Sequence, residues 1–381
     1  MTRANGTLPG IWPCAIDVGY SSVKVFAPNQ VAVFPSFARP FNQTIIGTLP
    51  PSHILYRDAD TGETWIVGEG AQEEISQDDT TISEESVFGR ARYDDPMFQV
   101  LVRTGIGIGL QDAGAASPEG RVIHIQTGLP PKYLKTDSGP LRSAMAGRHR
   151  FFLRIGNQPE QSFDFTIDAA HVAIMEQPMG TLMSVAIDNQ HKFVRGADRY
   201  FNGSVLVFDA GFGTLDLFPI RHNHVGDKQT FPEYGMIQVF RQTIEQIYES
   251  YGVEVSLVGF QQCLANGMVS RHDKFSSEKV PFADLLAKAD HDVCDAALEK
   301  LGQIFPLYDY DTLILTGGTG AAWNEQVRKK LQGLSSLQIV DGNVNDPALP
   351  FLLSNARGYY MYLFNSLERK IRAARGGSER R

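Results

Sequence analysis

The stretch VLVFDAGFGTLDLF, at residues 205–218, decides how the fold is interpreted. It begins as an apolar, β-branched strand, breaks at Asp209 into a turn of small residues, and then becomes apolar again. Glycine in such a turn adopts backbone conformations that other residues avoid, so the backbone N–H groups can turn inward. The stretch therefore predicts a β-hairpin whose turn could bind phosphate.

Two further stretches follow the same plan. AIDVGYSSVKV, at residues 15–25, is a strand that breaks at Asp17, and LILTGGTGAAW, at residues 313–323, is a strand that ends in a turn of threonine and glycine alone. Two aspartate-bearing hairpins far apart in the chain, followed by a Gly-Gly turn, predict a two-sided phosphate clamp with a shelf for a nucleoside. This combination is typical of an ATPase built from two similar halves.

The first hairpin offers several groups to a phosphate chain. The backbone amides and hydroxyls of Gly19, Ser21 and Ser22 could face the phosphates, and Lys24 on the next strand could neutralise their charge. A carboxylate repels phosphate, so Asp17 is expected to hold Mg²⁺ through water, because Mg²⁺ gives up its hydration shell reluctantly. The structural alternative is that the aspartate merely caps the hairpin turn.

The other two turns complete the predicted site. Asp209 takes the matching metal role, and the residues after it wrap the phosphates. In the third turn, Gly317 and Gly318 allow the backbone to lie flat against adenine and ribose, and the following helix N-terminus adds partial positive charge. A tight turn without ligand is the alternative there. The candidate nucleotide-binding residues are Asp17, Gly19, Tyr20, Ser21, Ser22, Lys24, Asp209, Gly211, Phe212, Gly213, Thr214, Gly317, Gly318, Thr319 and Gly320.

Hydrolysis also needs a polar group that places the attacking water. HVAIMEQPMG, at residues 171–180, offers Glu176 and Gln177 at the end of an apolar strand, before Pro178 stops it. A carboxylate there could orient water as a general base, and the neighbouring glutamine could share this role. The alternative is a glutamate on the surface or at a helix cap.

Composition limits the class of protein. Of 381 residues, 43% are hydrophobic and 20% are charged, which is typical of a globular protein of two large lobes. The net charge of −8 argues against direct binding of DNA over the surface. No apolar run is long enough for a transmembrane helix, no signal peptide is apparent, and three scattered cysteines form no disulfide framework. We therefore expect a cytoplasmic protein without a membrane partner.

The periodicity predicts elements along the whole chain. Residues 1–10 are expected to be a loose leader, 69–86 an acidic surface loop, and 366–381 a solvated basic tail. The loops at 41–63, 221–230 and 271–280 are candidate contacts between copies. Strands are expected at 14–18, 22–27, 31–34, 64–68, 121–127, 204–209, 312–316 and 337–340, and helices at 95–111, 178–192, 233–251, 282–303, 320–332 and 348–370.

Seven motifs together resemble the actin and sugar-kinase ATPase superfamily, and more narrowly the ParM-type bacterial actins. IDVGYSSVK resembles the first phosphate loop of that family, FDAGFGTLDL the second, and LTGGTG the adenosine loop. FPSFARP, WIVGEGA, TGLPPKYL and PFLLSNARGYYMY resemble further family elements, so the resemblance spans residues 14–365.

The resemblance implies an α/β, actin-like fold of two ribonuclease-H-like domains with a nucleotide cleft between them. Domain I would comprise residues 1–178, completed by the C-terminal helix 345–381, and domain II residues 179–344. Glu176 matches the catalytic glutamate of the family. The implied cofactors are ATP, with GTP as the alternative, and Mg²⁺.

The implied activity is ATP-dependent polymerisation into helical filaments that turn over on hydrolysis. A DNA-bound adaptor of the ParR type would couple the filaments to segregation of plasmid or other DNA. Two alternatives stay open. One is a small-molecule kinase of the same superfamily, and the other is an ATP-binding scaffold of a pilus or division machine.

Overall fold

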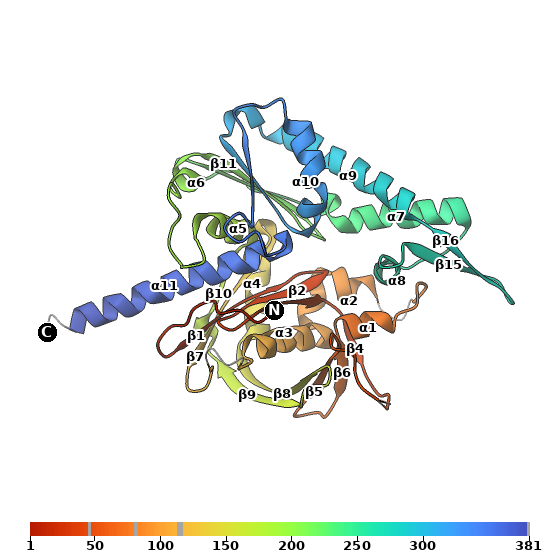
Figure 1. Cartoon of the computed structure of the whole chain (residues 1–381), viewed down its shortest axis with the longest axis horizontal. Helices are drawn as coiled ribbons and strands as arrows, with labels where there is room; N and C mark the ends of the chain where they lie inside the picture. The colour runs from red at the N-terminus through yellow and green to blue at the C-terminus, as the bar shows by residue number, and fades with distance from the viewer. Residues whose placement is uncertain (45–46, 80–82, 113–116, 379–381) are drawn as a thin grey trace.

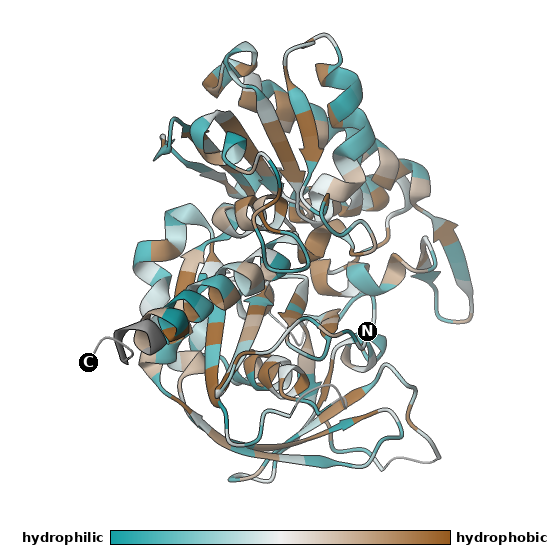
Figure 2. Cartoon of the chain, turned by 60° about the vertical axis from the view of Figure 1, so that its left-hand side comes forward, coloured by the Kyte–Doolittle hydropathy of each residue, from teal (hydrophilic) through white to brown (hydrophobic). Residues whose placement is uncertain are grey.

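The computed structural model describes residues 1–44, 47–79, 83–112 and 117–378 of the chain. Figure 1 shows two lobes, one above the other, with the C-terminal helix α11 (Ser354–Ser378) running between them and projecting at one end. Each lobe is built around a central sheet. Figure 2 shows that the inner strands of these sheets are apolar, whereas the projecting half of α11 is largely polar.

The lower lobe contains a five-stranded sheet in the order β10-β7-β1-β2-β3. Strands β1, β2 and β3 form an antiparallel meander, and β7 and β10 extend the sheet beyond β1 in parallel. Because both faces of β1 are covered, its sequence is an almost uninterrupted apolar run, as expected for a central strand. The strands are β1 (Ile11–Val18), β2 (Ser22–Phe26), β3 (Val31–Pro35), β7 (Val122–Leu129) and β10 (Val172–Glu176).

The upper lobe repeats this plan. Its sheet runs β13-β12-β11-β17-β18, with β14 also pairing with β12. Again an antiparallel meander is followed by two parallel strands. The strands are β11 (Ser204–Ala210), β12 (Leu215–Arg221), β13 (His224–Val225), β14 (Gln229–Phe231), β17 (Thr312–Thr316) and β18 (Gln338–Asp341). The predicted α/β fold of two similar halves is therefore confirmed.

Two further sheets lie outside this repeat. One has five strands in the order β4-β6-β5-β8-β9, and the other is the hairpin β15–β16. Their strands are β4 (Ala38–Pro40), β5 (Ile54–Asp58), β6 (Thr64–Val67), β8 (Gly147–Ile155), β9 (Gln161–Ile167), β15 (Met268–His272) and β16 (Ser277–Pro281). The region 271–280, expected to be a loop, thus forms most of a hairpin. Its strands are short and polar, so they carry little apolar alternation.

Helices cover the faces of both sheets. They are α1 (Glu69–Glu73), α2 (Glu84–Phe88), α3 (Pro96–Gly109), α4 (Leu134–Met145), α5 (Gln177–Ala186), α6 (Arg199–Asn202), α7 (Met236–Tyr251), α8 (Leu257–Cys263), α9 (Ala283–Ile304), α10 (Gly318–Leu331) and α11. As predicted, Asp95 caps α3 by accepting a hydrogen bond from the backbone N–H of Met97 at 2.8 Å, and Pro96 begins the helix. Within the described ranges, no helix is both long and apolar enough to cross a bilayer.

Two expectations about helix ends are wrong. The helix predicted over 178–192 ends at Ala186, because the chain turns there and Phe193 pairs back with Ile187. The predicted basic tail continues α11 as a helix to Ser378, while residues 379–381 lie outside the described residues. The acidic loop expected at 69–86 contains α1 and the start of α2, and its residues 80–82 also lie outside the described part of the chain.

The N-terminal leader is also not loose, contrary to expectation. The amino group of Met1 donates to the carbonyl of Val31 at 2.9 Å, and the guanidinium of Arg3 lies 2.5 Å from a carboxylate oxygen of Asp346. Tyr360 of α11 donates a hydrogen bond to the carbonyl of Gly6 at 2.9 Å. These partners lie far away in the sequence, so no local pattern could reveal them.

Helices α5 and α11 cross between the two lobes. The crossing is close, since a Cβ atom added to Gly358 of α11 would lie 1.7 Å from the carbonyl oxygen of Gly180 on α5. One buried cluster around these helices joins side chains of both central sheets, including Phe26 of β2 and Val207 of β11. The predicted domain boundaries, at 178/179 and 344/345, remain a prediction.

Candidate functional site

A cleft of about 240 Å³ lies between the lobes, where the turns after β1, β11 and β17 meet. The three turns that the sequence singled out therefore line one cavity, together with the first residue of α5. Of the predicted site residues, those that line it are Asp17, Gly19, Tyr20, Ser21, Ser22, Lys24, Gln177, Asp209, Gly211, Phe212, Gly213, Thr214, Gly317, Gly318 and Thr319. Glu176 and Gly320 are not among the lining residues.

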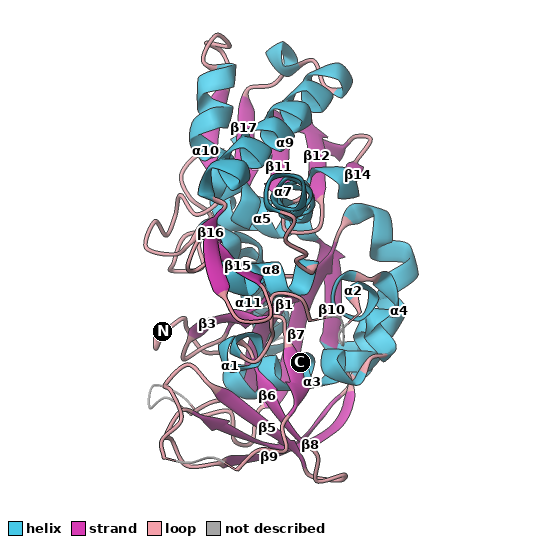
Figure 3. Cartoon of the chain, turned by 90° about the vertical axis from the view of Figure 1, so that its right-hand side faces the viewer, coloured by secondary structure: helices cyan, strands magenta, loops and turns pink. Residues whose placement is uncertain are grey.

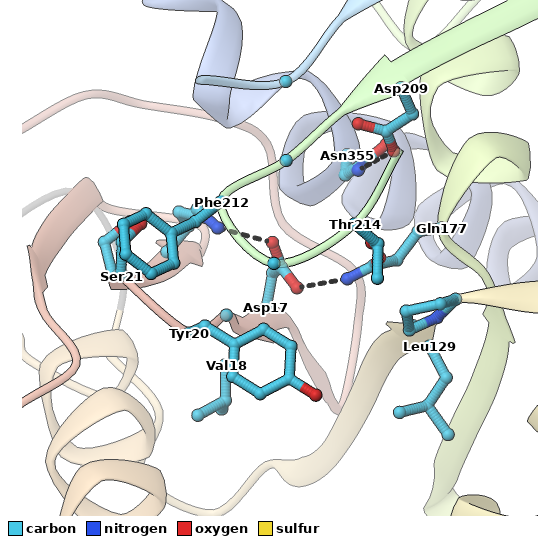
Figure 4. Close-up of a pocket in the computed structure, with 18 of the residues that line it drawn as sticks. Asp17, Val18, Tyr20, Ser21, Leu129, Gln177, Asp209, Phe212, Thr214 and Asn355 are labelled. Atoms are coloured by element: carbon cyan, nitrogen blue, oxygen red, sulfur yellow. Dashed lines mark hydrogen bonds and ion pairs between the residues drawn. The ribbon is translucent and has the colours of Figure 1, made fainter. Parts of the chain in front are cut away.

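Asp17 is held between a cation and an amide. One carboxylate oxygen lies 3.0 Å from Nζ of Lys24, which stands directly opposite Asp17 across the β1–β2 pair. The other accepts a hydrogen bond from Nε2 of Gln177 at 3.3 Å, as Figure 4 shows. The hairpin register thus produces the ion pair, whereas the contact with Gln177 depends on the position of α5.

Asp209 faces the cleft from the upper lobe and is buried. Its carboxylate accepts a hydrogen bond from Nδ2 of Asn355, on α11, at 2.8 Å (Figure 4). Burial raises the pKa of Asp209 to about 6, the Asn355 hydrogen bond opposes this shift, and the Asp17 carboxylate adds to it. A divalent cation between the carboxylates of Asp17 and Asp209 would offset the cost of burying the charge of Asp209. It would also offset the repulsion between the two carboxylates.

A second buried carboxylate stands beside Asp209. Asp216 lies opposite it in the β11–β12 pair and accepts hydrogen bonds from the hydroxyls of Thr214 at 3.0 Å and Thr230 at 2.5 Å. Burial raises the pKa of Asp216 to about 8, and the nearby charge of Asp209 contributes in the same direction. Asp216 is not among the residues predicted from the sequence, although its place just after the Gly-Thr turn offered a signal.

Glu176 ends β10 and points toward the upper lobe. Its carboxylate lies 2.5 Å from Nζ of Lys228, just before β14, and its side chain is 15% exposed. The carboxylate of Glu176 is thus paired with a cation of the upper lobe. The side chain of the next residue, Gln177, instead donates a hydrogen bond to Asp17. The two candidate catalytic side chains therefore have different environments.

The turns after β1 and β11 touch across the cleft. A Cβ atom added to Gly213 would lie 2.5 Å from the ring of Tyr20, so only glycine fits there without a shift. Arg92 lies under the same ring, 4.3 Å from its centroid, and donates hydrogen bonds to the carbonyls of Val18 at 2.7 Å and Gly19 at 3.2 Å. Arg92 and Asn355 support the loops from distant elements, so the sequence analysis missed both.

The third turn is shaped by Gly317. Its φ is +88°, and an added Cβ would lie 2.1 Å from the carbonyl oxygen of Ala210. Thr319, in the first turn of α10, donates a hydrogen bond to the carbonyl of Gly211 at 2.7 Å. These contacts join the third turn to the turn after β11. Gly320 lies within α10, where an added Cβ would make ordinary contact with Leu315.

The composition of the cleft fits a nucleotide with a divalent cation. Glycine turns leave backbone N–H groups without covering side chains, Lys24 supplies one cation, and the buried hydroxyl of Thr127 lines the cleft without a hydrogen-bond partner. Among the described residues, no group of three or more His, Cys, Asp or Glu side chains could hold a metal alone. A Mg²⁺ ion near Asp17 and Asp209 would therefore complete its shell with water and phosphate oxygens.

Residues 15–180 match a family model described as the N-terminal domain of actin-like proteins. No curated protein matches the sequence significantly.

Several solved structures have the same fold. A ParM filament of 15 strands from Clostridium botulinum matches with a TM-score of 0.68 and 17% identity, over 93% of this chain and 99% of that chain. A non-polymerisable quadruple mutant of the ParM called pCBH gives a TM-score of 0.69 and 16% identity, over 92% and 98%. An archaeal actin homologue in complex with ADP gives 0.60 and 15%, over 94% and 100%.

The turn after β1 and Gln177 thus lie inside the matched segment, and the turn after β11 and α11 complete the cleft beyond it. Residues 15–180 are thus similar to the N-terminal domain of actin-like proteins, and the chain as a whole has the actin-like fold seen in the solved ParM structures.

Proposed function

We propose that this protein is an ATPase that binds Mg²⁺-ATP between its lobes and polymerises into dynamic filaments. The observation that carries the proposal is the pair of aspartates, Asp17 and Asp209, that face one cleft from matching hairpins of two similar sheets. Relatives of the same fold include a ParM filament, which supports self-association.

Each side of the cleft has a distinct part in this proposal. Lys24 and the first phosphate loop neutralise and hold the phosphates, and Asp17 and Asp209 hold Mg²⁺ through water. Gly317 and Gly318 give the nucleoside a flat surface. Bound Mg²⁺ would supply charge stabilisation for phosphoryl transfer. ATP is the proposed nucleotide, with GTP as the alternative.

Glu176 and Gln177 are proposed to place the attacking water. Gln177 lines the cleft, and its Nε2 donates to Asp17, so its side chain lies beside one of the proposed metal-binding aspartates. Glu176 is paired with Lys228 of the upper lobe. We propose that hydrolysis requires this ion pair to break, which couples catalysis to the relative position of the lobes.

We further propose that the filaments segregate plasmid or other DNA in the cytoplasm, through a DNA-bound adaptor of the ParR type. The net charge of −8 supports an indirect link to DNA, because an acidic surface repels the phosphate backbone. Purified protein should not shift DNA at physiological salt. A shift that weakens with added salt would contradict the need for an adaptor.

Right-angle light scattering with parallel measurement of phosphate release tests the main proposal. Mg²⁺-ATP should cause scattering to rise above a critical concentration and to decay as phosphate appears. Asp209→Ala should weaken Mg²⁺-ATP binding and abolish assembly. A flat trace from the wild-type protein despite ATP binding would contradict polymerisation and favour a kinase or a scaffold.

A further inference from the structure

The hairpin β15–β16 projects from one end of the molecule. In Figure 1 it extends away from both lobes at the right, and among the described strands it pairs with no other sheet. Its tip is closed by a hydrogen bond from the backbone N–H of Asp273 to the carbonyl of Ser276 at 2.9 Å. At this tip the side chain of Phe275 is 99% exposed, the highest value among the exposed large apolar side chains described.

The base of the hairpin is firmly held. Val269 and Val280 are buried in the core of the upper lobe, and Gln77 forms two hydrogen bonds with the backbone of Ser270. A two-stranded hairpin is marginal on its own in water, so this anchoring keeps the strands folded away from the body. An anchored hairpin with a fully exposed phenylalanine at its tip is suited to insertion into another molecule.

The opposite end of the upper lobe is also apolar. Phe193 is 59% exposed and packs edge-on against Phe201 of α6, with ring centroids 6.2 Å apart, and Tyr308 is 72% exposed. We name Phe193, Phe201 and Tyr308 the apolar pole. These side chains lie at one end of the upper sheet. Ser204, which begins β11 just after Phe201, pairs with Arg221 of β12, and the guanidinium of Arg221 lies 3.6 Å from the carboxylate of Asp309, the residue after Tyr308.

The hairpin and the apolar pole face away from each other. Figure 1 shows α6 toward the left of the long axis and the hairpin at the right. A surface at one end that complements a different surface at the other end makes a heterologous, head-to-tail contact. Such a contact builds an open polymer when the rotation between copies does not close a ring.

We propose that Phe275 of one copy docks on the apolar pole of a second copy of this chain. The chemistry of the two surfaces matches, because both present aromatic rings. Asp273 and Lys274 precede Phe275, and the ion pair of Arg221 with Asp309 lies beside Tyr308, so each surface carries a positive and a negative group that could pair with the other. This contact rests on the proposed polymerisation and identifies residues that carry it.

Substitution of Phe275 tests the contact with little risk to folding, because the exposed ring buries almost nothing within its own chain. Phe275→Ala should raise the critical concentration for assembly about tenfold or more, as expected for an aromatic residue at the centre of an interface, while nucleotide affinity stays unchanged. Tyr308→Ala should have a similar effect. Val122→Ala removes an exposed apolar side chain from the lower lobe and serves as the control.

Crosslinking gives a second measurement. Ser276→Cys and Lys192→Cys variants, which keep all the aromatic side chains, are prepared separately in a Cys263→Ser background, since Ser276 and Lys192 are exposed whereas Cys14 and Cys294 are buried. A short bismaleimide should link the two variants as a mixed dimer when Mg²⁺-ATP is present, and neither variant alone should crosslink comparably.

The outcomes separate the two proposals. A wild-type protein that never assembles overturns the proposed function, and this contact with it. A wild-type protein that assembles, together with a Phe275→Ala variant of unchanged critical concentration and no mixed crosslink, overturns the contact alone.

Discussion

The side-chain amide of Gln77 pairs with both backbone groups of Ser270. Its Oε1 accepts from the N–H of Ser270 at 2.6 Å, and its Nε2 donates to the carbonyl at 2.5 Å. The backbone carbonyl of Gln77 also accepts from the N–H of Ser256, just before α8, at 2.8 Å. Figure 3 shows α8 and β15 between the upper and lower sheets, so these bonds join the lobes on the side of the cleft away from α5 and α11.

Gln77→Ala should loosen this junction, because it removes the two hydrogen bonds between the Gln77 side chain and the backbone of Ser270. We expect hydrogen exchange in α8 and β15 to rise about tenfold, with little change in the central sheets. Amide exchange followed by mass spectrometry checks this. Gln161→Ala, at an exposed position on β9, is the matched control, and equal exchange in both variants would show that Gln77 does not hold the lobes together.

Gly317→Ala should destabilise the protein by roughly 2 kcal/mol, since the residue has a positive φ and an added Cβ would strike a backbone carbonyl. Gly318→Ala is the control, because the nearest atom to its added Cβ is 3.8 Å away. Urea unfolding without nucleotide measures both. Equal losses of stability would mean that the backbone of the third turn is not fixed as described.

Asp216→Asn should stabilise the nucleotide-free protein in a pH-dependent way. The pKa of Asp216 is raised to about 8 in the folded state, so the folded protein keeps a proton that the unfolded chain loses at lower pH. The contribution of Asp216 to the free energy of unfolding of the wild-type protein is therefore present at acid pH. It is lost as the pH rises toward 8. The gain in Tm from the substitution should grow from pH 5 to pH 8 and then level off.

Thermal scans at several pH values measure that gain, with Asp164→Asn as the control. Asp164 is exposed, and its hydrogen bond to Arg148 lowers the pKa of its carboxyl, so its replacement should not stabilise the protein at neutral pH. A gain in Tm for Asp216→Asn that is the same at every pH would contradict the raised pKa.

Glu176→Ala should slow phosphate release roughly 100-fold and leave ATP binding intact, and the filaments should persist. Lys228→Ala breaks the same ion pair but keeps the carboxylate, so its turnover should be at least that of the wild type. Single-turnover phosphate release distinguishes these variants. Unchanged turnover in Glu176→Ala would remove this residue from the catalytic role, and Gln177→Ala would then be compared.

The central strands and the three turns could be predicted because local sequence determines them. A strand covered on both faces is a run of apolar residues, and a turn such as that at Gly317 requires glycine. The cavity residues Asp17 and Asp209 followed from their position at the ends of such strands. Two similar hairpins in one chain then indicated two similar lobes.

Other features depend on contacts between distant segments and leave no local pattern. Asn355 reaches Asp209 from the last helix, and Arg92 supports Tyr20 from a segment after α2. The ion pair between Glu176 and Lys228 joins the two lobes, so only the folded arrangement reveals it. The anchored N-terminal segment was missed for the same reason.

The tight crossing of α5 and α11 at Gly180 and Gly358 has a mechanical consequence. Helices whose backbones touch at one point can rotate about that point more easily than they can slide apart. If the cleft opens, the two lobes are therefore expected to rotate about this helix crossing. The crossing lies near the middle of the molecule and the hairpin tip at one end of the long axis, so a few degrees of rotation would displace Phe275 more than any residue of the cleft. A small change around a phosphate would thus be magnified where copies of the protein are proposed to meet.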